Sequence, residues 1–340
     1  MRVNINFLRA RLRAPWVSSR GSVNAVPLVT LRLHGSDGVV GVGEASALGL
    51  PDDEVLVALE DCREVLADTD GEPRAEVLAA CADLAVLPQA VAAVDLALHD
   101  LAARRARVPV WQLLGAEAAA PVLVNATSTA ADRAGAAAAA SAARSAGFCC
   151  LKVKVGLGDD AGRLAAVRAA AGSGMAIRLD ANGAWSVPEA VAALRALEPV
   201  GIELCEEPVS GLDALATVAE ETEATIALDE SAALPGALDA RACDAVCLKI
   251  ARCGGIAGTL DAARRARTVG YQVYLASTLD GPLGIAAALH VAAAIRPDRP
   301  CGLATLPAFA GRRDPLPAVD GTIRMPAGAG LGDGLTEWYG

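Results

Sequence analysis

The chain has 340 residues, of which 54% are hydrophobic, and a formal net charge of −10 at pH 7. This length exceeds the usual size of one domain and predicts a large domain with a smaller module. An acidic chain with 3% aromatic residues lacks the basic surface and the stacking side chains that nucleic acids require, so we expect a small-molecule ligand instead. No uninterrupted apolar run approaches the roughly eighteen residues of a membrane span, so we expect no membrane association.

The N-terminal stretch MRVNINFLRARLRAP alternates apolar and charged residues at the period of a strand and lacks the apolar core of a secretory signal. We therefore expect a cytoplasmic protein. Nine cysteines occur at irregular spacing, and several lie inside apolar runs, namely Cys149, Cys150, Cys205 and Cys247. This usage predicts buried free thiols in a reducing compartment.

Residues 1–118 are predicted to form an α+β module. Its strands are expected at Arg2–Leu12, Pro27–His34 and Gly38–Glu44. The pair Asp37-Gly38 favours a hairpin turn between the last two strands, which makes the sheet antiparallel. Helices are predicted to follow at about residues 52–68, 73–84 and 88–106.

Residues 119–306 alternate short apolar runs with alanine-rich helical stretches. The eight candidate strands are Val122–Asn125, Cys150–Val155, Ala176–Asp180, Ile202–Glu206, Thr225–Asp229, Ala245–Lys249, Gln272–Ala276 and Cys301–Thr305. Predicted helices between them include residues 132–147, 160–171, 187–197 and 256–270. A βα unit roughly every 25 residues favours a (β/α) barrel of the TIM type over an open sheet. The Gly- and Pro-rich tail 307–340 has no room for another unit and is expected to return to the N-terminal module.

Carboxylates end three consecutive candidate strands: Asp180, Glu206 and Asp229. Catalytic groups of such barrels lie at the carboxyl ends of the strands, so these side chains should converge. Three oxygen ligands without His or Cys suit Mg²⁺, with Mn²⁺ as an alternative. The structural alternative is that each carboxylate pairs with a neighbouring Lys or Arg.

Lysines end the strands on either side of these carboxylates. Lys152 and Lys154 are two residues apart and share one face of a strand, and Lys249 ends the strand four places further round the barrel. A metal-bound substrate would lie between them, and we expect nearby positive charge to lower the lysine pKa values toward those of general bases. The alternative is a solvated strand edge. The histidines His34, His99 and His290 have no partners at metal-ligand spacing and are interpreted as structural.

Five segments carry a family resemblance when taken in order: LKVKVG (151–156), RLDANGAW (178–185), CEEPV (205–209), ALDES (227–231) and LKIARCGG (248–255). Together with GVGEAS (41–46) and VPVWQLLG (108–115), they resemble the muconate-lactonizing subgroup of the enolase superfamily over nearly the whole chain. The resemblance implies a modified TIM barrel that holds Mg²⁺ beneath an α+β capping domain, which the C-terminal tail joins.

The resemblance also implies roles for individual residues. Asp180, Glu206 and Asp229 match the metal ligands, and Asn182 matches a residue that supports them. Lys154 matches the acid/base residue, Lys152 its companion and Lys249 the opposing lysine, in enediolate chemistry of the kind known for this superfamily. Strand alternation points Glu207 and Glu230, the neighbours of two ligands, away from the site.

The reaction depends on the last two strands and the capping loops. ASTLDGPLG (276–284) and CGLATLPAF (301–309) are similar to o-succinylbenzoate synthases, although Asp280 replaces the usual glutamate and Gly281-Pro282 a small polar pair. Dipeptide epimerases typically carry Asp-x-Asp on the last strand, where this chain has Leu303, Ala304 and Thr305. Arg20, Ser277 and Thr305 are the candidate substrate contacts.

The first choice is therefore an o-succinylbenzoate synthase-like dehydration of the menaquinone pathway, in which Lys154 removes the α-proton and then protonates the departing hydroxide. The alternative is a dipeptide epimerase or N-acylamino acid racemase with Lys154 and Lys249 as the two bases. An alternative from another functional class is a non-catalytic barrel that binds a metal and a ligand without turnover. The expected partner is a small carboxylate substrate, and the sequence leaves open whether the chain forms a homo-oligomer.

Overall fold

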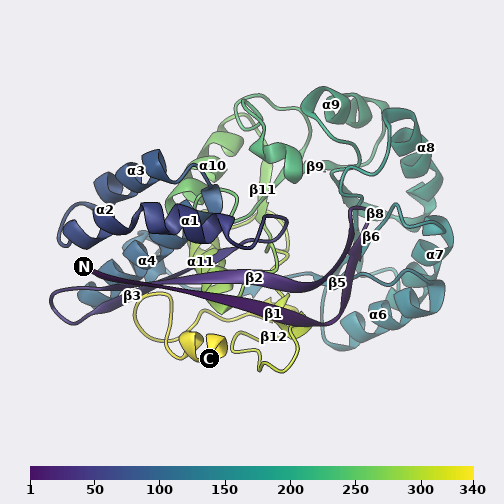
Figure 1. The fold of residues 1–340 in the computed structure, drawn as a ribbon. Helices are drawn as coiled ribbons and strands as arrows, with labels where there is room; N and C mark the ends of the chain where they lie inside the picture. Colours follow the sequence, from purple (N-terminus) through teal and green to yellow (C-terminus); the bar gives the residue numbers. More distant parts are fainter.

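A computed structural model describes residues 1–340. The N-terminal part is a three-stranded antiparallel sheet in the order β1 (Arg2–Ser18), β2 (Gly21–His34) and β3 (Val40–Ser46). The register pairs Ser18 with Gly21, so β1 and β2 extend beyond the predicted ranges to a tight turn at residues 19 and 20. Figure 1 shows this long hairpin running from the N-terminal part and bending toward the strands of the second part.

Helices cover one side of this sheet. They are α1 (Glu54–Asp61), α2 (Arg63–Asp68), α3 (Arg74–Leu84), α4 (Pro88–Ala106) and the short α5 (Val110–Leu113). Helix α4 packs tightly on β3, where glycines allow the close approach: a Cβ on Gly43 would lie 2.0 Å from the Ala93 carbonyl oxygen. Leucines and valines of the sheet and the helices form a separate buried cluster that includes Leu31, Leu59 and Leu98.

Seven parallel strands form the second part. In sheet order they are β5 (Ala126–Ser128), β6 (Cys150–Lys154), β7 (Ala176–Asp180), β8 (Ile202–Glu206), β9 (Ile226–Leu228), β10 (Ala245–Leu248) and β11 (Gln272–Leu275). The predicted eighth strand is reduced to two parallel bridges, Val124 with Cys301 and Ala276 with Gly302. These bridges join the first strand region to the last, so the sheet closes into the expected barrel. The predicted first strand is also divided, because β4 (Val122–Leu123) pairs with the C-terminal tail instead.

The helices around the barrel follow the predicted ranges closely (Figure 1). They are α6 (Arg133–Ser145), α7 (Asp160–Ala171), α8 (Val187–Leu197), α9 (Leu212–Glu221), α10 (Ile256–Thr268) and α11 (Pro282–Ile295), with short 3-10 turns η1 (Glu198–Val200), η2 (Glu230–Ala233) and η3 (Leu306–Ala308). No helix has the length and apolar character needed to cross a membrane. All nine cysteines are free, but Cys149 is exposed, so the prediction that it is buried was wrong.

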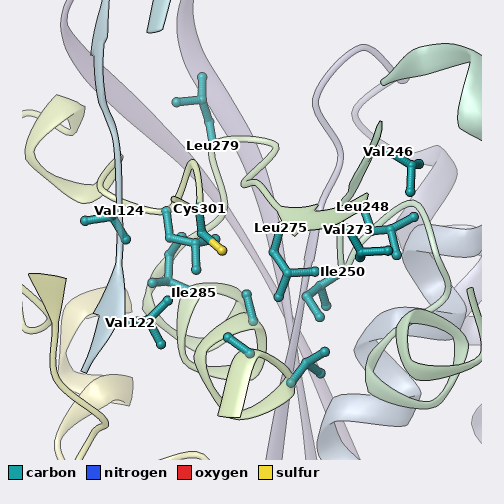
Figure 2. Packing of buried hydrophobic residues seen from close by; sticks show 14 of the residues in the cluster. Val122, Val124, Val246, Leu248, Ile250, Val273, Leu275, Leu279, Ile285 and Cys301 are labelled. Atoms are coloured by element: carbon teal, nitrogen blue, oxygen red, sulfur yellow. The ribbon is translucent and has the colours of Figure 1, made fainter. Parts of the chain in front are cut away.

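Strand alternation separates two environments in the barrel. In β10, Val246 and Leu248 point outward into the main core against the helices, part of which is visible in Figure 2. Ala245 and Cys247 point inward and belong to a small cluster of six residues inside the barrel. Inward-facing residues at the strand ends are therefore in phase and reach the barrel mouth together.

The C-terminal tail returns to the N-terminal part. It carries β12 (Ala318–Val319), β13 (Thr322–Ile323) and the 3-10 helix η4 (Leu335–Tyr339). The amide of Ala310 donates to the Arg11 carbonyl at 2.8 Å, and that of Val110 donates to the Gly330 carbonyl at 2.9 Å. We propose on this basis that residues 1–118 and 307–340 form one capping unit and residues 119–306 the barrel.

Candidate active site

The predicted carboxylates and lysines meet at the carboxyl end of the barrel. Parallel pairing sets Lys154 beside Asp180 and Asp180 beside Glu206, so these three side chains lie at one level. The Lys154 Nζ lies 2.6 Å from Asp180 Oδ2 and donates to Asn182 Oδ1 at 2.9 Å. The Lys152 Nζ lies 2.7 Å from the same Asp180 oxygen and also donates to Glu206. In one sector of the barrel mouth, Asp180 thus contacts both lysines, and Lys152 bridges Asp180 and Glu206.

The third carboxylate, Asp229, forms an ion pair with Lys249 on the opposite side of the barrel mouth. The Lys249 Nζ lies 2.6 Å from Asp229, and Arg252 lies 3.4 Å from the same carboxylate. Strands β7, β8 and β9 separate β6 from β10 in the sheet order, so Lys249 faces Lys154 from the other side of the mouth. A molecule held at the centre would have an amine on each side.

The three carboxylates and three lysines are all buried, and burial makes their charges interdependent. Burial raises the pKa of the Asp180 carboxyl, but Lys152 and Lys154 more than offset this and lower it overall. Burial opposes charge on Lys152, yet Asp180 and Glu206 raise its pKa well above the usual value. The pKa of Lys249 is raised for the same reason, mainly by the charge of Asp229. For Lys152 and Lys249 the carboxylates therefore outweigh burial, and the predicted lowering of their pKa values needs a cation that neutralises these carboxylates.

Two of the three predicted metal ligands, Glu206 and Asp229, lie close enough together to share a cation, and Asp180 lies outside this group. Ligand oxygens of Glu206 and Asp229 lie within 4.8 Å of each other and of Cys247 Sγ. Burial raises the pKa of the Cys247 thiol well above its usual value, so this group is a protonated neighbour that a hard cation disfavours. The Glu206 Oε1 atom is buried without any hydrogen-bond partner. The ion pairs of the structural alternative are present, and the Arg178 guanidinium lies 3.7 Å from this oxygen, but a cation at this position would give the oxygen a direct partner.

The basic residues of the chain are distributed unevenly. Lys152, Lys154 and Lys249 are its only lysines, and every other basic residue among the 30 Lys and Arg is an arginine. Arginine supplies permanent positive charge, whereas lysine has a pKa that its surroundings can shift enough to let it act as a base. All the lysines lying in one buried site is therefore evidence for proton transfer there.

A cavity of about 320 Å³ opens above these groups. All the predicted site residues line it except Glu206 and Asp229. The hairpin turn closes over it: Ser19 Oγ donates to the Ala181 carbonyl at 2.7 Å, and Arg20 Nε donates to the Asn182 carbonyl at 3.2 Å. Ser277 Oγ accepts from Thr305 Oγ1 at 3.2 Å on the far wall. The three predicted substrate contacts therefore face one space.

The family models match nearly the whole chain. Residues 2–115 match the mandelate racemase/muconate lactonizing enzyme N-terminal domain, and residues 135–337 match the enolase C-terminal domain-like family. The chain belongs to this family of metal-dependent enzymes in the enolase superfamily. The predicted membership of the muconate-lactonizing subgroup of the enolase superfamily and the predicted fold class, a modified TIM barrel with an α+β capping domain, are confirmed.

Named relatives of this enolase superfamily chain catalyse different reactions. An L-Ala-D/L-Glu epimerase of Clostridium acetobutylicum is 30% identical over 86% of each chain. A chloromuconate cycloisomerase of Cupriavidus necator is 33% identical over 87% of this chain and 85% of its own. The solved dipeptide epimerase of Cytophaga hutchinsonii, complexed with Mg and D-Ala-L-Val, superimposes with a TM-score of 0.90 at 29% identity over 98% of this chain and 97% of that chain.

The prediction that Glu207 and Glu230 point away from the site is half right. Glu207 is buried and accepts hydrogen bonds from the Asp229 and Ser231 amides at 2.8 and 3.0 Å, so it supports the strand end from outside the cavity. Glu230 instead lines the cavity, 3.7 Å from Arg20 and 3.9 Å from Arg252. Alternation does not apply to Glu230, because β9 ends at Leu228 and a 3-10 turn begins at residue 230.

Two arginines of the site were missed from the sequence. Arg252 follows Lys249 by three residues in the LKIARCGG segment and lines the cavity, a position that the segment itself could have indicated. Arg178 fills the barrel interior beneath Glu206, with its guanidinium 4.4 Å from the centre of the Tyr274 ring and 3.3 Å from Glu203. Its place two residues before Asp180 was the available signal, because that spacing puts both side chains on one face.

Proposed function

We propose that the chain racemises or epimerises the α-carbon of an N-acylated amino acid. The observation that carries this proposal is the pair Lys154 and Lys249, one on each side of the cavity and each beside its own carboxylate. Exchange of configuration needs a proton donor and a proton acceptor on opposite faces, whereas a syn dehydration uses one face. The epimerases and racemase among the relatives support this alternative better than the o-succinylbenzoate synthase-like dehydration expected first.

We also propose that Asp180, Glu206 and Asp229 hold Mg²⁺. The donor set consists of carboxylate oxygens, the kind of ligand that this cation prefers, and Glu206 Oε1 has a free acceptor position. When bound, the cation would supply positive charge beside the substrate carboxylate, where loss of the α-proton adds a second negative charge. Asn182 accepts a hydrogen bond from Lys154 Nζ at its side-chain Oδ1, and its backbone amide donates to Asp180 Oδ1. These two contacts keep the lysine in place beside its carboxylate.

In the proposed reaction, Lys154 as the free amine takes the α-proton from one face, and Lys249 as the ammonium returns a proton to the other. The opposite enantiomer reverses the two roles. Lys152 contacts Asp180 and Glu206 and lines the cavity, so its N–H groups would be available to the developing negative charge. The hairpin turn at Ser19 and Arg20 covers the site and limits the access of water.

The cavity wall indicates the acyl group. On the side of β5, β11 and the closing bridges, the polar lining residues are Thr127, Ser277, Thr278 and Thr305, none of which carries a charge. The capping side adds the apolar Trp16, Val23 and Leu48, and Arg20. A free ammonium on the substrate would find no carboxylate on the uncharged wall. We therefore expect N-acylamino acids with neutral or acidic acyl groups to react better than free dipeptides.

Proton exchange in heavy water tests this function. Wild type, Lys154→Ala and Lys249→Ala are incubated with Mg²⁺ and each enantiomer of N-acetyl and N-succinyl amino acids and dipeptides, and α-deuterium is followed by NMR. Wild type should exchange and epimerise both enantiomers, and each variant should lose epimerisation but retain exchange with the one enantiomer that its remaining lysine attacks. If wild type dehydrates the cyclohexadiene-carboxylate substrate and epimerises none of these compounds, the proposed function is wrong and the dehydration expected first is correct.

A further inference from the structure

A buried carboxylate outside the catalytic cluster joins three distant parts of the chain. Glu44 in β3 is 3% exposed. Its Oε1 accepts from the Gly281 amide at 2.5 Å and its Oε2 from the Gly284 amide at 3.3 Å, both at the N-terminal end of α11. The hydroxyl of Tyr339, in the C-terminal tail, donates to the same carboxylate. The capping sheet, a barrel helix and the tail therefore meet at Glu44.

Glu44 serves as the N-terminal cap of α11 from another part of the fold. The residue at the N-cap position is Gly281, which has no side chain to accept the free amides of the first turn. A carboxylate satisfies these amides and interacts favourably with the positive end of the helix dipole. The Leu283 amide is satisfied by the Tyr339 hydroxyl at 3.1 Å, so the same pair of side chains caps the whole turn.

The run Gly281-Pro-Leu-Gly284 fits this contact closely. A Cβ on Gly281 would lie 2.7 Å from the Tyr339 hydroxyl oxygen and 2.8 Å from Glu44 Oε2. A Cβ on Gly284 would lie 2.7 Å from the Asp280 Cβ. Glycine at both positions lets the carboxylate reach the helix, which gives a physical reason for the departure from the family pattern at Gly281-Pro282.

The segment that the cap fixes forms a wall of the cavity. Residues 276–281 connect β11 to α11, and Ser277, Thr278 and Leu279 line the cavity. The Asp280 amide donates to Ser277 Oγ at 2.8 Å, and Thr278 Oγ1 donates to Asp280 at 2.6 Å. Leu279 has a φ of +60°, a conformation that costs a residue with a Cβ about 1 kcal/mol and persists only where the surroundings hold it.

The same strand holds the other side of this segment. Ser46 follows Glu44 by two residues, and its Oγ donates to the Thr278 carbonyl at 3.1 Å. Two residues of one strand face thus contact the segment before and after Leu279. The strained residue is held by the capping sheet on both sides.

We propose that Glu44, together with Tyr339, is a positioning residue that orders the 276–281 segment and so shapes the acyl end of the substrate cavity. The ordering of the segment stands independently of the reaction. Only the consequence for substrate binding rests on the function proposed above.

Hydrogen–deuterium exchange measures the ordering without a substrate. Burial and, to a lesser extent, the nearby charge of Asp280 raise the pKa of Glu44 to about 7. The measurement is therefore made near pH 8.5, where the carboxylate is ionised. The variants are Glu44→Gln, which turns one acceptor into a donor, and Tyr339→Phe, which removes one hydroxyl. Glu76→Gln, an exposed glutamate of α3 with no bound partner, is the matched control.

We expect Glu44→Gln to speed exchange at least tenfold over residues 276–285, with a smaller effect of Tyr339→Phe and none of the control. Residues 150–154 of β6 should be unchanged. Unchanged exchange over 276–285 in both variants, or a uniform rise over all segments, would overturn the proposal, since the latter reports only lost global stability.

A kinetic measurement extends the test to the cavity. On an N-acylamino acid that wild type racemises, Glu44→Gln should raise KM at least fivefold and change kcat less than twofold. Equal KM values for Glu44→Gln and Glu76→Gln would contradict the role in shaping the cavity. If wild type racemises no N-acylamino acid, the proposed function fails, and the exchange measurement still decides the role of Glu44.

Discussion

Acidification should destabilise the protein through one buried histidine, His290 in α11. Its Nδ1 accepts from the Trp111 amide at 3.3 Å, which leaves Nε2–H to donate to the Leu331 carbonyl at 3.2 Å, so only the neutral ring satisfies both contacts. Burial lowers its pKa from 6.5 to about 4. The unfolded chain therefore binds the additional proton between about pH 6.5 and 4, and stability is complete above this window and falls as the pH drops through it. The difference between these two pKa values corresponds to about 3 kcal/mol of stability.

Urea denaturation of wild type and His290→Asn between about pH 4.5 and 8 isolates this contribution. The difference in free energy of unfolding between the two proteins should be constant above about pH 7 and should shrink by about 2 to 3 kcal/mol toward the acid end. His34→Asn serves as the control, because His34 is the last residue of β2 and is only partly buried. This change should leave the wild-type pH dependence of stability nearly intact. A wild-type minus His290→Asn difference that does not vary with pH would refute the reasoning.

Two further changes test the site and the packing of the cap. Asp229→Asn should weaken Mg²⁺ binding at least tenfold, followed through the NMR signals of isotope-labelled lysine, since the only lysines of the chain lie in the site; an unchanged midpoint would mean that Asp229 binds no metal. Gly43→Ala should lower stability by about 2 kcal/mol because its Cβ would lie 2.0 Å from the Ala93 oxygen, whereas Gly174→Ala, where a Cβ meets nothing within 4 Å, should be nearly neutral in thermal unfolding.

The sequence was sufficient for the barrel and the placement of the catalytic groups. Strand alternation is a local rule, so Lys152 and Lys154, or Arg178 and Asp180, share the inner face wherever the strand lies. The carboxyl ends of parallel strands meet at one mouth, so residues that end successive strands converge whatever the details of packing. Period and order along the chain were therefore enough to bring these side chains together.

Only the tertiary structure decided the features that depend on contacts between distant segments. The predicted eighth strand is reduced to bridges with Val124 and Ala276, two contacts with distant segments that no local pattern indicates. Glu230 turns into the cavity because the strand before it ends early, where alternation ceases to apply. Glu44 reaches Gly281 across 237 residues, and no local pattern in GVGEAS indicates which helix it caps. Alternation and propensity act over a few residues, whereas these contacts depend on how whole elements dock.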